Sequence, residues 1–200
     1  MGLREAKKEH TRQQIAEAAM RLFVKRGFDR VTVADVADAA GVSEKTVFNY
    51  FPTKEDLFFD EVDEREAALV DAIRERAPGD SVTEVLHRAQ SANCSRWATP
   101  HFRRFAQVVE ASPALRAKEL EVMARFEHTL ARALREELGC DELDAEVAAT
   151  LLIGVHWTFF VAARRRALAG EHGPRAEKRL RRDLDRAFAL LEHGLADLGR

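Results

Sequence analysis

The sequence predicts an all-α protein that consists of a small N-terminal three-helix domain and a larger C-terminal helical domain. Apolar residues recur at spacings of three and four, the helical period, and no segment shows the strict apolar and polar alternation of a strand. Glycine and proline interrupt this pattern where helices are expected to end. With 46% apolar and 33% charged residues, the chain has the composition of an ordinary soluble globular protein.

Two helices are predicted at the N-terminal end. The first runs from Arg12 to Gly27, since glycine is common just past the C-terminal end of a helix. Its apolar stripe consists of Ile15, Ala18, Ala19, Leu22 and Phe23. The second is short, begins after the N-cap signal of Thr32 and Asp35, and ends at Gly41.

A third helix is predicted between Ser43 and Pro52, with Val47, Phe48 and Phe51 facing inward. Two helices that cross steeply need a small residue at their contact, a glycine in the turn and a branched apolar residue on the second helix. Ala37, Gly41 and Val47 occupy such positions. This spacing predicts a helix-turn-helix over residues 33–51.

The other face of the third helix is polar and comprises Glu44, Lys45, Thr46, Asn49 and Tyr50. Lys45 suits guanine O6 and N7, Asn49 suits adenine N6 and N7, and Thr46 suits a thymine methyl group or a phosphate. Residues 1–54 carry ten Lys or Arg and seven Asp or Glu, a net charge of +3, whereas the rest of the chain carries −5. The polar face and the basic balance both favour DNA binding by the N-terminal domain.

Several segments together resemble a known family. They are IAEAAMRLF at 15–23, GF at 27–28, TV at 32–33, VA at 36–37, AGVS at 40–43, YF at 50–51 and KEDL at 54–57. This pattern, which covers about the first 60 residues, is similar to that of the TetR (tetracycline-repressor) family. The rest of the chain shares only the expected length and the all-helical character.

The resemblance implies a DNA-binding domain at 1–55 and a ligand-binding and dimerisation domain at 56–200. It implies a homodimer whose recognition helices enter successive major grooves, about 34–36 Å apart. It also implies phosphate contacts by Tyr50 and Lys54, and Thr32 and Ser43 are expected to combine helix capping with phosphate contact. The expected function is a repressor that binds a palindromic double-stranded operator and is released by a small molecule, although an activator fits the same features.

In the C-terminal region, one long helix is predicted from Thr53 to Pro78-Gly79, with the domain boundary inside it. Further helices are predicted at 82–96, 100–111, 114–138, 144–169 and 175–198. Concentrated aromatic residues predict a mostly apolar effector pocket with His156 as a polar anchor. The candidate lining residues are Trp97, Phe102, Phe105, Phe126, His156, Trp157 and Phe160.

The last two predicted helices are assigned to the dimer interface. The helix at 144–169 is apolar on more than one face, and the final helix has leucines at spacings suited to packing on another helix. The candidate interface residues are Leu151, Val155, Leu184, Phe188, Leu191 and Leu195. Packing within one chain would give the same pattern, and only the family resemblance favours a dimer.

Other classes of function lack support in the sequence. No nucleophile elbow, phosphate loop or Cys-His signature indicates an enzyme, and no cofactor motif is recognised. The two cysteines, and histidines without ligand spacing, predict no metal site. The charged N-terminus and the lack of eighteen uninterrupted apolar residues predict a cytoplasmic protein without a membrane partner. A helical protein-interaction module that binds no DNA remains the alternative, which the basic N-terminal balance disfavours.

Overall fold

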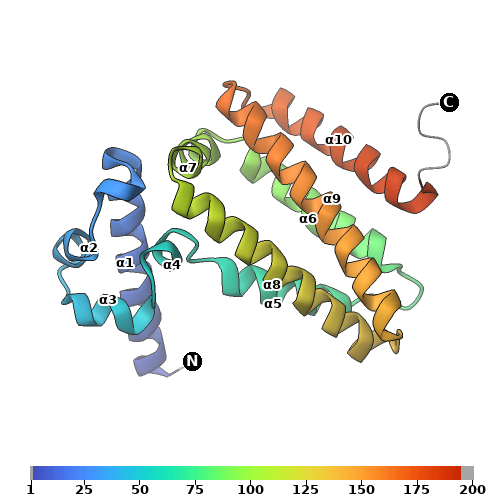
Figure 1. Cartoon of the computed structure of the whole chain (residues 1–200), viewed down its shortest axis with the longest axis horizontal. Helices are drawn as coiled ribbons and strands as arrows, with labels where there is room; N and C mark the ends of the chain where they lie inside the picture. The colour runs from blue at the N-terminus through green and yellow to red at the C-terminus, as the bar shows by residue number, and fades with distance from the viewer. Residues whose placement is uncertain (1, 195–200) are drawn as a thin grey trace. The chain divides into compact units, whose positions relative to one another are not determined.

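The computed structural model describes residues 2–194, and within this range it contains helices and no strands (Figure 1). The element order is α1 (Leu3–Arg26), η1 (Phe28–Arg30), α2 (Val33–Ala40), α3 (Glu44–Tyr50), α4 (Lys54–Phe58), α5 (Val62–Arg74), α6 (Val82–Trp97), α7 (Pro100–Ala111), α8 (Pro113–Leu138), α9 (Glu142–Leu168) and α10 (Pro174–His193). The all-α prediction is therefore confirmed. The first helix begins earlier than predicted, at Leu3 instead of Arg12.

The chain folds into two compact units. The N-terminal unit contains Met1–Asp63 together with Gln107–Glu119, and the C-terminal unit contains Glu64–Ala106 together with the chain from Leu120 onward. The corner between α7 and α8 joins the N-terminal unit because the buried Ser112 hydroxyl donates to the carboxylate of Asp29, 2.7 Å away. The predicted domain boundary after residue 55 stays a prediction.

The core of the N-terminal unit is a cluster of three phenylalanine rings. Phe23 lies 4.9 Å from Phe28 and 6.1 Å from Phe58 between ring centroids, and all three side chains are buried. Rings at such separations gain favourable edge and face contacts beyond the area that they bury. The cluster joins α1, η1 and α4, and so holds α4 against the first helix of this unit.

The long helix predicted from Thr53 to Pro78-Gly79 is wrong, because it breaks at Phe59–Glu61 into α4 and α5. The amide of Val62 donates to the carbonyl of Phe59, which is the tighter spacing of a turn. The carbonyl of Asp60 instead accepts a hydrogen bond from the Arg12 guanidinium of α1. A side chain from another helix thus supplies the partner that a continuous helix would have provided.

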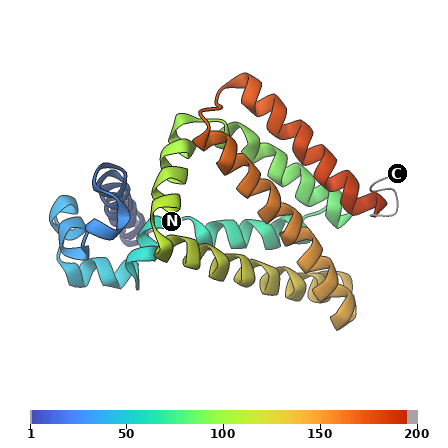
Figure 2. The same cartoon turned by 45° about the horizontal axis from the view of Figure 1, so that its top comes forward.

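In the C-terminal unit, α6, α9 and α10 lie side by side in both views (Figures 1 and 2). The apolar stripe of α10 faces the other two helices and is buried at Ala176, Leu180, Leu184 and Phe188. One face of α9 is buried as well, whereas another leaves Leu143, Val147 and Leu151 exposed. The apolar stripe of α10 is therefore covered within the chain, whereas one apolar face of α9 is exposed to solvent.

Helix α9 is long and apolar enough to cross a membrane when judged only by length and composition. It is the one helix in the described part of the chain that meets this test, and a core helix of a soluble protein can meet it too. No group of three or more His, Cys, Asp or Glu side chains within residues 2–194 is arranged to hold a metal ion.

Candidate nucleic-acid interface

The start of α2 is fixed by a reciprocal cap. The Thr32 hydroxyl accepts a hydrogen bond from the Asp35 amide at 3.1 Å, and the Asp35 carboxylate accepts one from the Thr32 amide at 2.8 Å. Arg26 of α1 donates to the same carboxylate at 2.9 Å. The bonds from the Thr32 backbone and from Arg26 lower the pKa of Asp35 to about 2. Asp35 therefore joins α2 to α1 as a carboxylate, while Thr32 stays exposed.

The turn between α2 and α3 depends on Gly41. Its φ of 67° lies in the left-handed region, where a side chain would be strained, and its amide donates back into the last turn of α2. Ala37 and Val47 on either side of this turn are 2% and 0% exposed. Gly41 thus provides the turn, and Ala37 and Val47 are buried on the two helices, as predicted for a helix-turn-helix.

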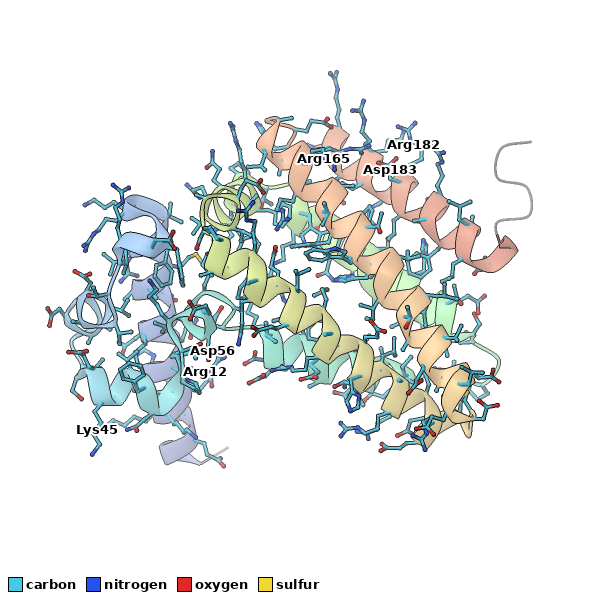
Figure 3. All side chains as sticks on the ribbon, viewed as in Figure 1. Arg12, Lys45, Asp56, Arg165, Arg182 and Asp183 are labelled. Atoms are coloured by element: carbon cyan, nitrogen blue, oxygen red, sulfur yellow. The ribbon has the colours of Figure 1, made fainter. Side chains whose placement is uncertain are left out.

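Helix α3 presents a polar outer face. The Ser43 hydroxyl caps it by accepting from the Thr46 amide at 3.1 Å, and it also lies 2.8 Å from the Thr46 hydroxyl. Lys45 and Asn49 are exposed, and the Lys45 side chain extends away from the rest of the N-terminal unit (Figure 3). Tyr50 is half-buried. Ser43 and Thr46 thus form the cap, whereas Lys45 and Asn49 are exposed on the outer face.

The inward orientation predicted for Phe48 is wrong, because its ring is 49% exposed. Consecutive helix residues are about 100° apart, so Phe48 points well away from the buried Val47 and is about 60° from Lys45, three residues earlier. Apolar periodicity over only two turns could not decide this, since Val47 and Phe51 alone satisfy the pattern. Its spacing of three from Lys45 could have predicted that Phe48 lies on the exposed face.

Lys54 does not extend outward as a phosphate contact would require. Its ammonium donates to the carbonyls of Phe28 and Val31, each 3.2 Å away, and lies 4.1 Å from the centre of the Phe28 ring. Lys54 thereby holds the start of α4 against η1. We assign this residue a role in the architecture of the N-terminal unit.

Arg12 connects the end of α3 to the break between α4 and α5. Its guanidinium lies over the ring of Phe51, 5.3 Å from the centroid, and donates to the carbonyl of Asp60. Phe51 is the C-cap of α3 and is 3% exposed. Arg12 therefore links the break after α4 to the C-terminal end of α3.

Comparison with known proteins agrees with this geometry. The model for bacterial regulatory proteins of the tetR family matches residues 15–60, which includes α2, α3 and α4. The chain is 26% identical over 162 residues to the HTH-type transcriptional regulator TcmR of Streptomyces glaucescens, covering 77% of this chain and 71% of that protein. It is 28% identical over 163 residues to the HTH-type transcriptional regulator LuxR of Vibrio harveyi, covering 77% and 79%.

Residues 15–60 carry the DNA-binding domain of the TetR family. The relatives named above are transcriptional regulators, and the family is one of DNA-binding proteins rather than enzymes. FadR from Bacillus subtilis, solved in complex with stearoyl-CoA, is similar in fold with a TM-score of 0.58 and 22% identity over 90% of this chain and 96% of FadR. NalD of Pseudomonas aeruginosa is also similar, with a TM-score of 0.57 and 19% identity over 90% and 97%.

Most of the predicted pocket residues meet in the C-terminal unit. Trp97 lies 6.2 Å from His156 and 5.7 Å from Phe160 between ring centroids, and Phe102 lies 5.7 Å from Phe160. Phe105 stacks on Phe102, and Trp157 stacks on Phe160. Phe126 is buried on α8. The sequence therefore identified an aromatic cluster, and its use as a pocket stays a prediction.

His156 is the polar group of this aromatic cluster. Burial lowers its pKa to about 4, with a further contribution from the positive charge of Arg65. The imidazole is therefore neutral at physiological pH and keeps one donor and one acceptor nitrogen. A neutral ring among aromatic side chains suits a ligand that is mostly apolar and carries a hydrogen-bonding group.

The predicted dimer residues fall into two groups. Leu184 and Phe188 are 0% and 3% exposed within a single chain, so they pack inside it, which is the alternative that the sequence left open. Leu151 is 52% exposed, whereas Val155 and Leu191 are half-buried. Leu195 lies outside the described residues. Of these candidates, Leu151 alone presents a large apolar side chain to a partner.

Proposed function

We propose that this TetR-family regulator is a homodimeric repressor that binds a palindromic operator through α3 and is released by a small molecule. The observation that carries the proposal is the outer face of α3, where Lys45 and Asn49 are exposed opposite the buried Val47. Both side chains match the donor and acceptor patterns of base edges in the major groove. Such a protein acts beside DNA in the cytoplasm and needs no cofactor.

Phosphate contacts are proposed at Thr32, Ser43 and Tyr50. These side chains lie at the start of α2, the start of α3 and the end of α3. Helix N-termini carry unpaired amides that favour an anion, and the capping hydroxyls keep acceptor and donor capacity beyond their caps. Together they would hold α3 in register on the DNA backbone, while Lys45 and Asn49 discriminate between sequences.

The dimer is proposed to form through the exposed face of α9. Leu143, Val147 and Leu151 are 69%, 49% and 52% exposed, and they follow one another at the helical spacing of four. Gly154 continues this face, and nothing lies within 4 Å of the place where its side chain would be. A second copy could therefore approach α9 closely at Gly154 and cover the three apolar side chains.

The effector is proposed to bind among the aromatic side chains around His156. FadR, a protein of this fold, was solved with stearoyl-CoA, whose long acyl chain is apolar, and this compound is the first to test here. Displacement of α5 by the ligand would reach α4 through Phe59–Glu61, and Arg12 would transmit it to Phe51 at the end of α3. A coupling of about 1–3 kcal/mol would lower operator affinity about 5- to 150-fold.

The test is binding of the full-length protein to DNA upstream of its own gene, by fluorescence anisotropy at several salt concentrations. Wild type should bind tightly, and Lys45→Ala and Asn49→Ala should each lose about 1–3 kcal/mol and relax specificity at one base pair per half-site. The control is Lys178→Ala, an exposed lysine of α10, which should bind as wild type does.

Two results would count against the proposal. If wild type binds every duplex equally, and neither α3 variant differs from it, the helical protein-interaction module becomes the better description. If wild type is specific but saturating stearoyl-CoA leaves its affinity unchanged, this effector class is excluded while the operator-binding function stands.

A further inference from the structure

The exposed Phe48 ring is an exception within the N-terminal unit. Phe23, Phe28, Phe51 and Phe58 are all between 0% and 3% exposed, whereas Phe48 is 49% exposed. Leaving a ring of this size half in water forgoes much of the free energy that its burial would provide. Local structure does not require the exposure either, because α3 is already held by Val47 on its buried side and by the Ser43 cap.

Phe48 shares the outer face of α3 with the two residues proposed to contact bases. Phe48 lies three residues and Asn49 four residues after Lys45, and residues three and four apart are neighbours on a helix surface, so Lys45 is flanked by both. Lys45, Phe48 and Asn49 therefore form one triangular patch, and all three side chains are exposed. A base contact by Lys45 would therefore bring the Phe48 ring toward the same groove.

The chemistry of this ring restricts what it can recognise. Phenylalanine has no donor or acceptor for a base edge or a phosphate. The major-groove edges of the four base pairs offer one apolar group, the C5-methyl group of thymine, and an aromatic side chain is a suitable contact for it. Thr46, whose methyl group is the other candidate for a thymine contact, is half-buried, and its hydroxyl lies 2.8 Å from the Ser43 hydroxyl at the cap.

We infer that Phe48 determines operator specificity by packing against the C5-methyl group of a thymine in each half-site, adjacent to the bases contacted by Lys45 and Asn49. The inference rests on the proposed operator binding by α3. It adds a specificity determinant that works by burial of apolar surface, beside two that work by hydrogen bonds. Thymine at this position would be distinguished from cytosine, and also from uracil, which lacks only the methyl group.

The experiment removes the methyl group from the DNA. Preferred duplexes are first selected from a random pool with the full-length wild-type protein, and each thymine is then replaced in turn by deoxyuridine. Wild type should lose about 4-fold in affinity at one thymine per half-site, and about 15-fold when both half-sites carry the change, as expected for one buried methyl group each. Phe48→Ala should bind the thymine and deoxyuridine duplexes equally.

Two further variants make the result specific. Thr46→Ser removes the only methyl group of that side chain but keeps the capping hydroxyl, and it should retain the full sensitivity to deoxyuridine. Phe48→Leu keeps an apolar side chain, so it should retain part of the sensitivity to deoxyuridine. It also provides a second test of the inference if urea unfolding shows that Phe48→Ala is less stable than wild type.

The inference is overturned if no thymine substitution affects wild type. It is also overturned if Phe48→Ala still binds the thymine duplex more tightly than the deoxyuridine duplex, by the same factor as wild type. The second result would mean that the ring packs on the sugar or on the partner base pair. Sensitivity that disappears in Thr46→Ser instead would transfer the thymine contact to Thr46. Failure of the wild-type protein to select any duplex would reject operator binding itself, an outcome distinct from all of these.

Discussion

Helices α9 and α10 are neighbours with similar amounts of leucine, but the protein uses their apolar surfaces differently. Helix α10 has one apolar stripe, and that stripe is covered by α6 and α9 within the chain, while its outer face carries arginine and lysine. Helix α9 is apolar on more than one face, so one face completes the core and the other is left exposed. A helix with a single apolar stripe thus serves the fold, and only surplus apolar surface is available to a partner.

The first prediction, which has the largest expected effect, concerns Phe188 in the buried apolar stripe of α10. Its ring is 3% exposed and lies 5.0 Å from the ring of His87. Phe188→Ala should lower the free energy of unfolding by about 3–5 kcal/mol, because the ring leaves a cavity between packed helices. Urea unfolding measures the loss.

The matched control is Arg186→Ala on the exposed face of α10, which should change stability by less than about 0.5 kcal/mol. A Phe188→Ala variant that unfolds like wild type but no longer dimerises would reverse the assignment of the two helices.

The second prediction concerns His156, which is half-buried on α9. Its pKa is about 4 in the folded protein and about 6.5 when unfolded, so folding favours the neutral ring. This stability is fully present above pH 6.5 and is lost as the pH falls from 6.5 to 4, by roughly 3 kcal/mol. Comparison of wild type with His156→Phe by urea unfolding across this range should isolate the contribution.

His172→Phe, at an exposed position, provides the control and should keep the wild-type pH dependence. If His156→Phe loses stability on acidification as steeply as wild type, the imidazole is not held neutral by burial and cannot act as the polar group of the aromatic cluster.

Local signals account for what the sequence predicted well. The cap of Thr32 and Asp35 and the glycine at 41 lie within the segment that they delimit, and α2 was predicted at its observed bounds of Val33–Ala40. The same is true of the Ser43 cap that begins α3. Signals of this kind act over one helical turn, so a single sequence contains all the information that they need.

What was missed depends on residues far apart in the chain. The break at Phe59–Glu61 involves the Arg12 guanidinium, 48 residues before the carbonyl that it meets, and the Lys54 ammonium binds carbonyls 23 and 26 residues away. The buried stripe of α10 has the same periodicity whether α6 or a second copy covers it. Periodicity identifies an apolar face, but it does not identify the surface that covers the face.

The third prediction tests the exposed side of α9. Leu151→Ala should raise the dimer dissociation constant by about 10-fold or more, because burying one leucine contributes about 1.5–3 kcal/mol. The stability of the single chain should hardly change, since the side chain is 52% exposed. Sedimentation equilibrium measures the dissociation constant.

Leu120→Ala serves as the control, because Leu120 of α8 is 60% exposed and lies outside the proposed interface. Equal weakening of the dimer by both substitutions, or a wild-type protein that stays monomeric at high concentration, would remove α9 from the interface.

The smallest expected effect concerns the polar contact between the two helices. Asp183 of α10, labelled in Figure 3, forms an ion pair with Arg166 of α9, and both side chains are about 30% exposed. A double-mutant cycle with Arg166→Ala and Asp183→Ala should give a coupling of about 0.2–1 kcal/mol that decreases in high salt. The pair of Arg132 and Glu136, which is more exposed, should give less.

The size of this coupling decides how α10 is held. A value within the expected range means that apolar burial at Leu184 and Phe188 fixes α10 on the unit and that the ion pair only selects its register against α9. A coupling several times larger, and insensitive to salt, would mean that the pair is desolvated in solution. The polar contact would then rank with the apolar stripe, and the contrast between α9 and α10 could no longer be explained by apolar surface alone.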